Sequence, residues 1–405
     1  MNSGQWPAFR VGAYRWYWVG GLVSDIGNWV QNTTVPYVVL MLTHQAVWVG
    51  IATAVSLLSQ VIGTLPGGRL ADRSDRLTLL LATNTLMLVL ALVLATMVMA
   101  GRAGPWEIIV ITGAMSLVFG LQHPSWRGLP ADLVPAEAMT SASHLTVTKF
   151  QVARALGPLV AGLLISGPGV VWAFWVNAFS FAGAIGALLL ITQTRRRSMS
   201  TEYPASAPAV LGSFKSALRV RGVWLGVALT GSIAFLGLPL VQLSTLLAVQ
   251  TYRIGPEAYG ILVSAFGWGS LLAAVAVSAF HHRLAGRWVV LYGFVVLSIA
   301  LLVAGMVPLY AVGVAAMACA GISFAIITTS CHAAVQLLAP AESRGRAAAL
   351  YAIALFGGSG IGVLMQAWLA GVFSVSAVLV AAGAVALAIA AMLGVRLHWF
   401  KSLDV

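Results

Sequence analysis

Three charged side chains lie deep inside long apolar stretches of the sequence. Asp25 falls near the middle of the stretch 14–40, and Lys149 and Arg154 fall within 139–166. If these stretches cross a bilayer, a charge at its centre costs roughly 2.5–3.5 kcal/mol even on lenient insertion scales. Such residues therefore usually face a cavity or one another. Asp25 is expected to pair with Arg154 or with Lys149, which precedes Arg154 by about a turn and a half.

Two roles are open for Asp25. A carboxyl group beside a cation has its pKa lowered, and burial raises it, so an Asp that moves between such environments could load and release a proton. The alternative is a fixed structural ion pair, or an Asp at a helix irregularity beside Gly27. Gln31 and Asn32 add polar groups to the same stretch, either as part of a cavity wall or as ordinary interhelical hydrogen bonds.

The composition identifies the class of protein that must position these residues. The chain has 405 residues, of which 60% are hydrophobic and 8% are charged. Soluble domains are about half apolar and about a quarter charged, so the sequence predicts an all-α polytopic membrane protein. Twelve stretches have the length of a membrane span: 14–40, 46–70, 77–99, 105–126, 139–166, 169–192, 223–250, 257–281, 287–306, 308–336, 345–373 and 375–397.

The distribution of basic residues predicts the orientation. Twelve spans place both termini on one side of the membrane. Of the 22 Lys and Arg residues, Arg102 and Arg253 fall on the opposite side and Lys149 and Arg154 within a span, which leaves 18 on the side of the termini. By the positive-inside rule that side is cytoplasmic. The rule also accounts for the net charge of +12 without a nucleic-acid partner.

The sequence repeats weakly at half its length. "PAE" at 135–137 returns at 340–342, each time after the fourth span of its half. The one long polar segment, 193–222, separates the halves and reads as a cytoplasmic linker. We therefore expect a six-helix bundle over 1–192 and another over 223–405. Such repeats are typical of transporters, with the substrate site between the halves near the middle of the membrane.

The turn after the second span carries the most specific motif, "GGRLADRSDR" at 67–76. It resembles the signature of the major facilitator superfamily, Gly-x-Leu-Ala-Asp-Arg-x-Gly-Arg-Lys, with Asp75 in place of the second Gly. The matching residues are Gly68, Leu70, Ala71, Asp72, Arg73 and Arg76. The segments 24–31, 153–162 and 338–351 extend the resemblance over the whole chain. The branch it resembles includes the enterobactin exporter and macrolide efflux proteins, which are drug:proton antiporters.

This resemblance implies the major facilitator fold of twelve transmembrane helices in two bundles. It also implies a conformational latch in which Asp72 contacts the start of the eleventh span, near 343–346. The latch would be helped by Arg73, Arg76 and a close backbone approach at Gly68. An ordinary positively charged loop is the alternative.

A second family element lies in the fifth span, where Gly157, Pro158 and Gly162 predict a bend. In the family this Gly-Pro element is read as an antiporter mark. Ordinary helix packing explains it equally well.

No enzyme signature is found. The sequence has no zinc-spaced His pair, no phosphate-binding Gly-Lys loop and no supported Ser–His–Asp set, so no catalytic residue, metal or cofactor is expected. Without a nucleotide loop, the energy source should be an ion gradient. Cys319 and Cys331 lie on one expected helix, roughly 18 Å apart, and should not bridge.

The sequence thus predicts a bacterial inner-membrane exporter of an amphipathic small molecule. We expect it to work as a monomer by alternating access, against protons, with both termini cytoplasmic. An importer or lipid flippase on the same fold is the alternative. A membrane-embedded enzyme would need clustered acids or histidines, and a non-transporting sensor would need an appended domain longer than the 30-residue linker.

Overall fold

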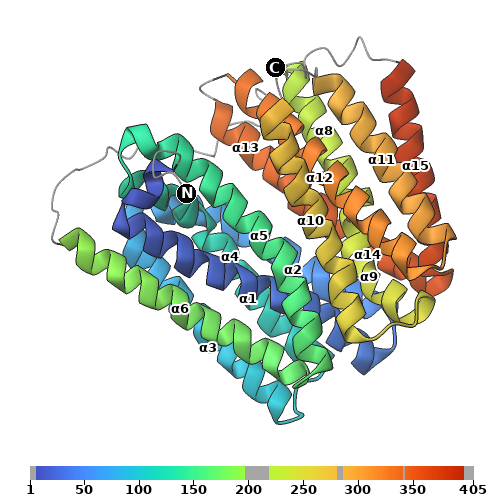
Figure 1. Cartoon of the computed structure of the whole chain (residues 1–405), viewed down its shortest axis with the longest axis horizontal. Coiled ribbons are helices and arrows are strands. Elements are labelled where there is room, and N and C mark those ends of the chain that lie inside the picture. The colour runs from blue at the N-terminus through green and yellow to red at the C-terminus, as the bar shows by residue number, and fades with distance from the viewer. Residues whose placement is uncertain (1–5, 197–218, 281–285, 341–342, 396–405) are drawn as a thin grey trace. The chain divides into compact units, whose positions relative to one another are not determined.

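The structure is a computed structural model that describes residues 6–196, 219–280, 286–340 and 343–395. These residues form helices and short turns, and no β-strand occurs among them (Figure 1). Most of the expected linker, 193–222, lies outside the described residues.

In the first half of the chain, the described residues 6–196 form six long helices. Two short 3₁₀ turns, η1 (Pro7–Arg10) and η2 (Ala136–Ala138), precede the first and the fifth of them. The helices are α1 (Gly12–Thr43), α2 (Ala46–Arg73), α3 (Arg76–Met99), α4 (Pro105–Leu133), α5 (Met139–Ser166) and α6 (Val170–Arg196).

In the second half, the residues that the structure describes form six further helical stretches, two of which are interrupted. The first runs through α8 (Arg221–Leu236), α9 (Leu238–Leu246) and the π-turn η3 (Leu247–Thr251). Then follow α10 (Pro256–Phe280), α11 (Gly286–Met306) and α12 (Tyr310–Leu338). The next runs through α13 (Arg344–Ala352), the π-turn η5 (Ile353–Gly357) and α14 (Gly358–Val372), and α15 (Val375–Val395) is last.

These twelve stretches confirm the expected spans, mostly to within a few residues. The largest difference is at the end of α4. The apolar stretch ends at 126, but the helix continues through Pro124 and Pro130 to Leu133. Ten of the stretches are long and apolar enough to cross a membrane by themselves. The other two, α1 and α5, are richer in polar residues and carry Asp25, Lys149 and Arg154.

The helices pack as two units. Unit 1 comprises Met1–Val35 and Ser59–Ala207, and unit 2 comprises Pro36–Leu58 and Pro208–Val405. The end of α1 and the start of α2 therefore pack with the second half of the chain. In unit 2, for example, Tyr37 of α1 stacks on Tyr259 of α10 with ring centroids 5.8 Å apart.

In unit 1, α3 packs along α6 and α4, as Figure 1 shows. Small residues allow α2 to cross α4 closely. A Cβ added at Gly63 or Gly67 would collide with the α4 backbone at Leu117 or Leu121, and one at Gly120 would collide with the α2 backbone. Within unit 1 the close approach to α4 is made by Gly67 and not by Gly68, where a Cβ would meet open space. The latch role of Gly68 would involve unit 2, and it stays a prediction.

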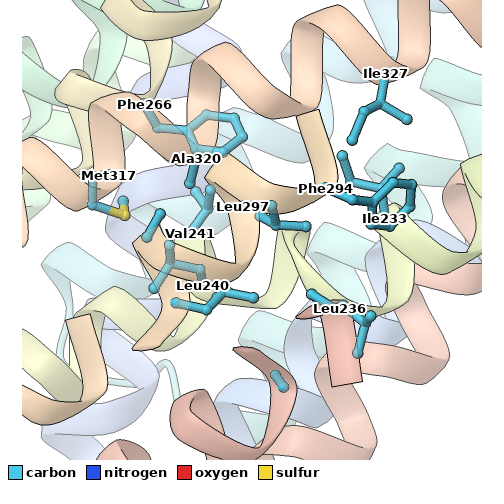
Figure 2. Packing of buried hydrophobic residues seen from close by; sticks show 14 of the residues in the cluster. Ile233, Leu236, Leu240, Val241, Phe266, Phe294, Leu297, Met317, Ala320 and Ile327 are labelled. Carbon is cyan, nitrogen blue, oxygen red and sulfur yellow. The ribbon is translucent and has the colours of Figure 1, made fainter. Parts of the chain in front are cut away.

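Unit 2 has a continuous apolar core. Side chains from α8, α9, α10, α11 and α12 converge in it, including Ile233, Leu240, Phe266, Phe294 and Met317 (Figure 2). Each of these five is almost fully buried.

One break in the seventh span has a local cause. Pro239 has no N–H, so the carbonyl of Phe235, four residues earlier, has no partner within its helix. The side chain of Gln366 on α14 donates its Nε2 hydrogen to that carbonyl at 2.7 Å. Gly362, one turn earlier on α14, lies against the Phe235 backbone. Gln366 thus provides the hydrogen bond that the Phe235 carbonyl lacks within its own helix, and it joins α14 to α8.

Candidate functional site

The deep charges of unit 1 meet between α1 and α5. Lys149 Nζ lies 3.1 Å from Asp25 Oδ2, and the exposed fractions of the two side chains are 7% and 19%. Of the two cations considered for Asp25, Lys149 is therefore the one that forms the ion pair. The small remaining exposure lies mostly on the carboxyl group.

Aromatic faces enclose the ammonium group of this pair. Lys149 Nζ lies 5.0 Å from the ring centroid of Tyr17 and 5.6 Å from that of Trp126. Both contacts are within the range of cation–π attraction. Gly21 makes the space, because a Cβ at that position would collide with Nζ. The lysine thus has one carboxylate partner and two aromatic partners.

Side-chain hydrogen bonds fix α1 against α5 on the N-terminal side of the pair. Tyr14 donates its hydroxyl to the carbonyl of Ala142 at 2.8 Å, and Trp18 donates its indole N–H to that of Leu145 at 3.0 Å. Each bond joins a side chain of α1 to the backbone of α5. They hold the register that brings Lys149 beside Asp25.

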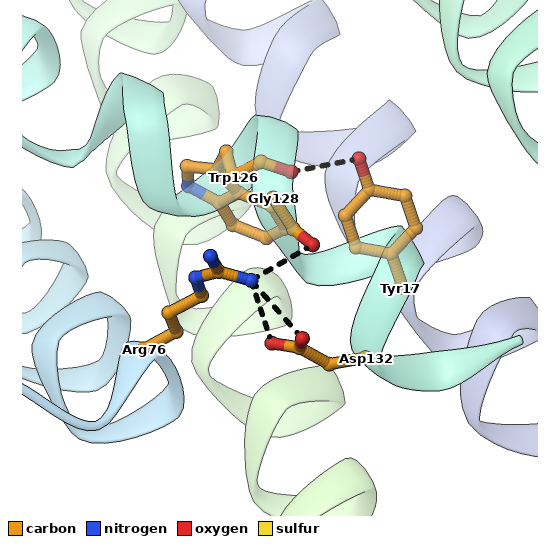
Figure 3. A network of polar contacts seen from close by, with 5 residues as sticks. All are labelled: Tyr17, Arg76, Trp126, Gly128 and Asp132. Carbon is orange, nitrogen blue, oxygen red and sulfur yellow. Dashed lines mark hydrogen bonds and ion pairs between the residues drawn. The ribbon is translucent and has the colours of Figure 1, made fainter. Parts of the chain in front are cut away.

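Tyr17 extends this support to α4. Its hydroxyl donates to the carbonyl of Trp126 at 3.2 Å, as Figure 3 shows. One turn further along α4, Arg76 of α3 bonds the carbonyl of Gly128 at 3.2 Å and pairs with Asp132 at 3.0 Å. The helices α1, α3 and α4 are therefore joined by polar contacts at this end of unit 1.

Arg154 is the second deep cation. Its guanidinium carbon lies 5.3 Å from the ring centroid of Trp29, and only 8% of the residue is exposed. Phe150 meets the same indole edge to face, with ring centroids 6.0 Å apart. Both deep cations of α5 thus lie on aromatic rings, but only Lys149 also pairs with Asp25.

The Gly-Pro element of α5 has a packing role in the structure. Gly157 lies against Trp29, and a Cβ there would collide with the Cβ of Trp29. Gly157, Pro158 and Gly162 are all buried in one uninterrupted helix. The contact therefore explains Gly157, and the antiporter role of the element stays a prediction.

The polar residues after Asp25 separate into two kinds. Gln31 is buried, accepts a hydrogen bond from Asn177 Nδ2 of α6 at 2.6 Å and contacts Met115 Sδ of α4 at 3.5 Å. Ser180 in turn donates to the backbone carbonyl of Asn177. Asn32 is exposed. Gln31 is thus an interhelical hydrogen-bonding residue, which was one of the two expectations for it.

Sequence reasoning missed a second buried polar cluster, between α3 and α4. Gln122 Oε1 accepts hydrogen bonds from Thr83 and from Asn84 Nδ2, each at 2.9 Å. The sequence signal was available, since an Asn and a Gln within membrane spans need partners. Tyr17 and Trp126 were missed for another reason. Aromatic residues near span ends resemble an interfacial belt.

The signature turn has local roles in unit 1. Asp75 caps α3 by accepting a hydrogen bond from the Thr78 N–H at 2.8 Å. Arg76, expected in the latch, is bonded to Asp132 and Gly128 of its own unit, and its part in a latch stays a prediction. Asp72 and Arg73 are exposed. The latch would join Asp72 to a residue of unit 2, and it stays a prediction.

Metal and thiol chemistry find little support in the part of the chain that the structure describes. No group of three or more His, Cys, Asp or Glu side chains that could hold a metal ion occurs there. Cys319 and Cys331 are unbridged, as expected.

The family described as transmembrane secretion effector matches residues 3–405. The chain belongs to this family of major facilitator transporters. Its similarity to enterobactin exporters also extends over most of its length. The protein of Citrobacter koseri is 23% identical over 368 residues, which is 89% of this chain and 84% of that protein. That of Salmonella typhi is 24% identical over 370 residues, with the same coverage.

Solved structures of low sequence identity share the fold. A bacterial homologue of the lysosomal transporter Spinster, inward-facing and occupied, aligns with a TM-score of 0.76 at 12% identity and covers 97% of both chains. A bacterial homologue of ferroportin aligns with a TM-score of 0.68 at 16% identity, over 95% of this chain and 99% of the other. The predicted fold class is confirmed, and the protein is a multi-span membrane transporter and not an enzyme.

Proposed function

We propose that this transporter exports an amphipathic small molecule by alternating access in exchange for protons, with Asp25 as the proton-carrying group. The observation that supports the proposal is the Asp25–Lys149 ion pair between α1 and α5. An ionisable residue within a membrane span is by default a functional candidate. Placing a charge there costs free energy, and an apolar residue would pack in the same position without that cost. Export is favoured by the similarity to enterobactin exporters.

The surroundings of Lys149 suit a carboxyl group that changes its charge. With Asp25 ionised, the pair is neutral. When Asp25 takes up a proton, the ammonium group loses its counter-ion and retains the faces of Tyr17 and Trp126. A desolvated cation–π contact contributes about 2 kcal/mol, so two of them make the unpaired cation tolerable within the bundle. Both states of Asp25 are therefore accessible, and the site differs by one positive charge between them.

The test is the Asp25→Asn variant in inside-out vesicles, with enterobactin as the first substrate probe. The amide keeps the shape and the hydrogen bond to Lys149 but cannot carry a proton. We expect uptake driven by a proton gradient to be lost, while substrate binding and counterflow remain. Glu107→Gln, the same change at an exposed position near the start of α4, is the matched control.

The possible outcomes separate the alternatives. Full gradient-driven uptake by well-folded Asp25→Asn would exclude Asp25 as the proton carrier. Loss of counterflow together with loss of coupled uptake would mean that Asp25 holds the substrate or the fold. Substrate accumulation in right-side-out vesicles, driven by an inward proton gradient and absent from inside-out vesicles, would favour an importer.

We further propose that the protein lies in a bacterial inner membrane as a monomer with both termini in the cytoplasm. The uneven distribution of Lys and Arg supports this orientation. A single cysteine placed in the linker, in a background with Cys319 and Cys331 replaced, should react with an impermeant maleimide only in broken cells. Reaction in intact cells would reverse the orientation.

A further inference from the structure

An apolar groove runs along the outside of unit 1, where α1 meets α6. One hollow of about 290 Å³ is lined by Val23, Gly27 and Phe179, among others. A second hollow of about 280 Å³ is lined by Trp16, Val23 and Gly186, among others. The two hollows adjoin at Val23, which lines both, and together they follow the seam between α1 and α6.

Small residues form the floor of the groove, and large apolar side chains form its walls. Gly20 lies so close to α6 that a Cβ there would collide with Ala187. At Gly186, in contrast, a Cβ would meet nothing within 4 Å, so the groove is open above it. Val19 and Phe179 stand at its edges with exposed fractions of 48% and 59%.

The length of the groove matches one leaflet of a bilayer. Its lining residues on α1 extend from Trp16 to Gly27, and at 1.5 Å per residue this span is roughly 17 Å long. The hydrocarbon core of a bilayer is about 30 Å thick, so one leaflet is about 15 Å. An extended acyl chain entering at the Trp16 end would therefore reach the middle of the membrane near Gly27.

A positive charge lies at the Trp16 end. Gly12 lies on the same face of α1 as Trp16, Val23 and Gly27, one turn before Trp16. The guanidinium of Arg15 folds over this position, with one of its terminal nitrogens 3.7 Å from where a Cβ of Gly12 would be. Arg15 is exposed, and Trp16 beside it is 46% exposed, as expected of residues at the headgroup level.

We propose that this groove binds one anionic phospholipid from the leaflet at the N-terminal end of α1, which is the cytoplasmic leaflet in the orientation proposed above. One acyl chain lies between α1 and α6, and the phosphate is bound by Arg15. Basic residues beside a transmembrane seam are a recognised way to hold anionic headgroups. The lipid lies against the turns of α1 that carry Gly21 and Asp25, so it supports the helix that forms the ion pair with Lys149.

The test compares lipid binding to three purified variants by native mass spectrometry. After delipidation, dioleoyl phosphatidylglycerol and, separately, dioleoyl phosphatidylcholine are titrated into wild type, Gly186→Leu, Arg15→Gln and a control. A Cβ at 186 meets nothing within 4 Å, so a Leu there can extend into the groove, and it favours the helix. The control is Gly371→Leu on α14, an exposed glycine that also has open space around it but lies outside the groove.

We expect one tightly bound phosphatidylglycerol on the wild type. Gly186→Leu should weaken it about tenfold, and Arg15→Gln about fivefold, the effect expected from one charge near an anionic headgroup. Arg15→Gln should leave phosphatidylcholine binding unchanged, and Gly371→Leu should match the wild type. Wild-type affinity in Gly186→Leu, or equal losses in Gly371→Leu, would overturn the groove. Equal binding of both lipids by the wild type would overturn the headgroup assignment. The measurement needs neither substrate nor proton gradient, so its failure would leave the proposed transport function standing.

Discussion

The Asp25–Lys149 pair makes a quantitative prediction about stability. Removing one partner of a buried ion pair usually costs about 3–5 kcal/mol, because the other charge is left uncompensated. Here the cost should lie at the lower end. In Asp25→Asn the ammonium keeps an amide oxygen and the rings of Tyr17 and Trp126, and in Lys149→Met the carboxylate keeps the 19% exposure of its side chain. We expect each single change to lower the free energy of unfolding by about 2–3 kcal/mol.

The double variant Asp25→Asn/Lys149→Met should be little worse than either single variant. It contains no uncompensated charge, and Met has nearly the length and volume of Lys. If its cost is about 3 kcal/mol, the coupling energy between the two positions is about 1–3 kcal/mol, as found for residues in direct contact. The measurement is reversible unfolding of the purified protein in mixed detergent micelles, with helicity as the signal, for the wild type and all three variants.

The result that would refute this reasoning is additivity. If the free energy of unfolding falls in the double variant by the sum of the two single decreases, Asp25 and Lys149 do not interact and the ion pair does not contribute to stability. Arg154→Met provides the comparison within α5, since Arg154 lies over Trp29 while Asp25 pairs with Lys149. Its combination with Asp25→Asn should be additive within about 0.5 kcal/mol.

Three further predictions concern the signature turn and the α2–α4 crossing. Gly68→Ala should raise the free energy of unfolding by about 0.5–1 kcal/mol, because its Cβ meets open space in a helix. Gly63→Ala should lower the free energy of unfolding by about 1–3 kcal/mol, because its Cβ would collide with α4. Thermal unfolding of both variants tests these two expectations. Arg76→Gln should lower stability by only about 1 kcal/mol, since its pair with Asp132 is one-third exposed on the Arg side, and the variant Asp132→Asn should show a similar loss. Asp72→Asn should leave stability unchanged and shift the transporter toward inward-facing states, so paired spin labels on the cytoplasmic ends of the two units should report longer distances; unchanged distances would end the latch hypothesis.

The helix boundaries could be predicted because hydrophobicity and length decide them. The interrupted seventh span was less accessible. Pro239 announces a break, but the partner of the freed Phe235 carbonyl is Gln366, which lies 131 residues away in the sequence. Only the packed structure shows that the glutamine was needed there.

The choice of partner for Asp25 shows a similar limit. Lys149 and Arg154 are five residues apart on α5, so helical periodicity puts them on different faces without saying which face meets Asp25. The deciding residue is Gly21 on α1, which leaves room for the ammonium group. The capping role of Asp75 was not predicted, although Asp is a preferred N-cap residue and the signal is local.

The two helices that carry the deep charges are also the ones with the most polar contacts to their neighbours near those charges. α1 and α5 fall short of the hydropathy expected of a span that inserts alone, so tertiary contacts must compensate. Tyr14 and Trp18 bond the backbone of α5, and Tyr17 bonds the backbone of α4. These bonds give partners to polar side-chain groups that lie between the helices, and they fix the register of α1 on α5. A carboxyl group that gains and loses a proton in this position changes the charge beside Lys149 without requiring α1 to slide. Any conformational response must therefore be a movement of α1 and α5 together, and substitutions that break the Tyr14 and Trp18 bonds should weaken coupling before they weaken substrate binding.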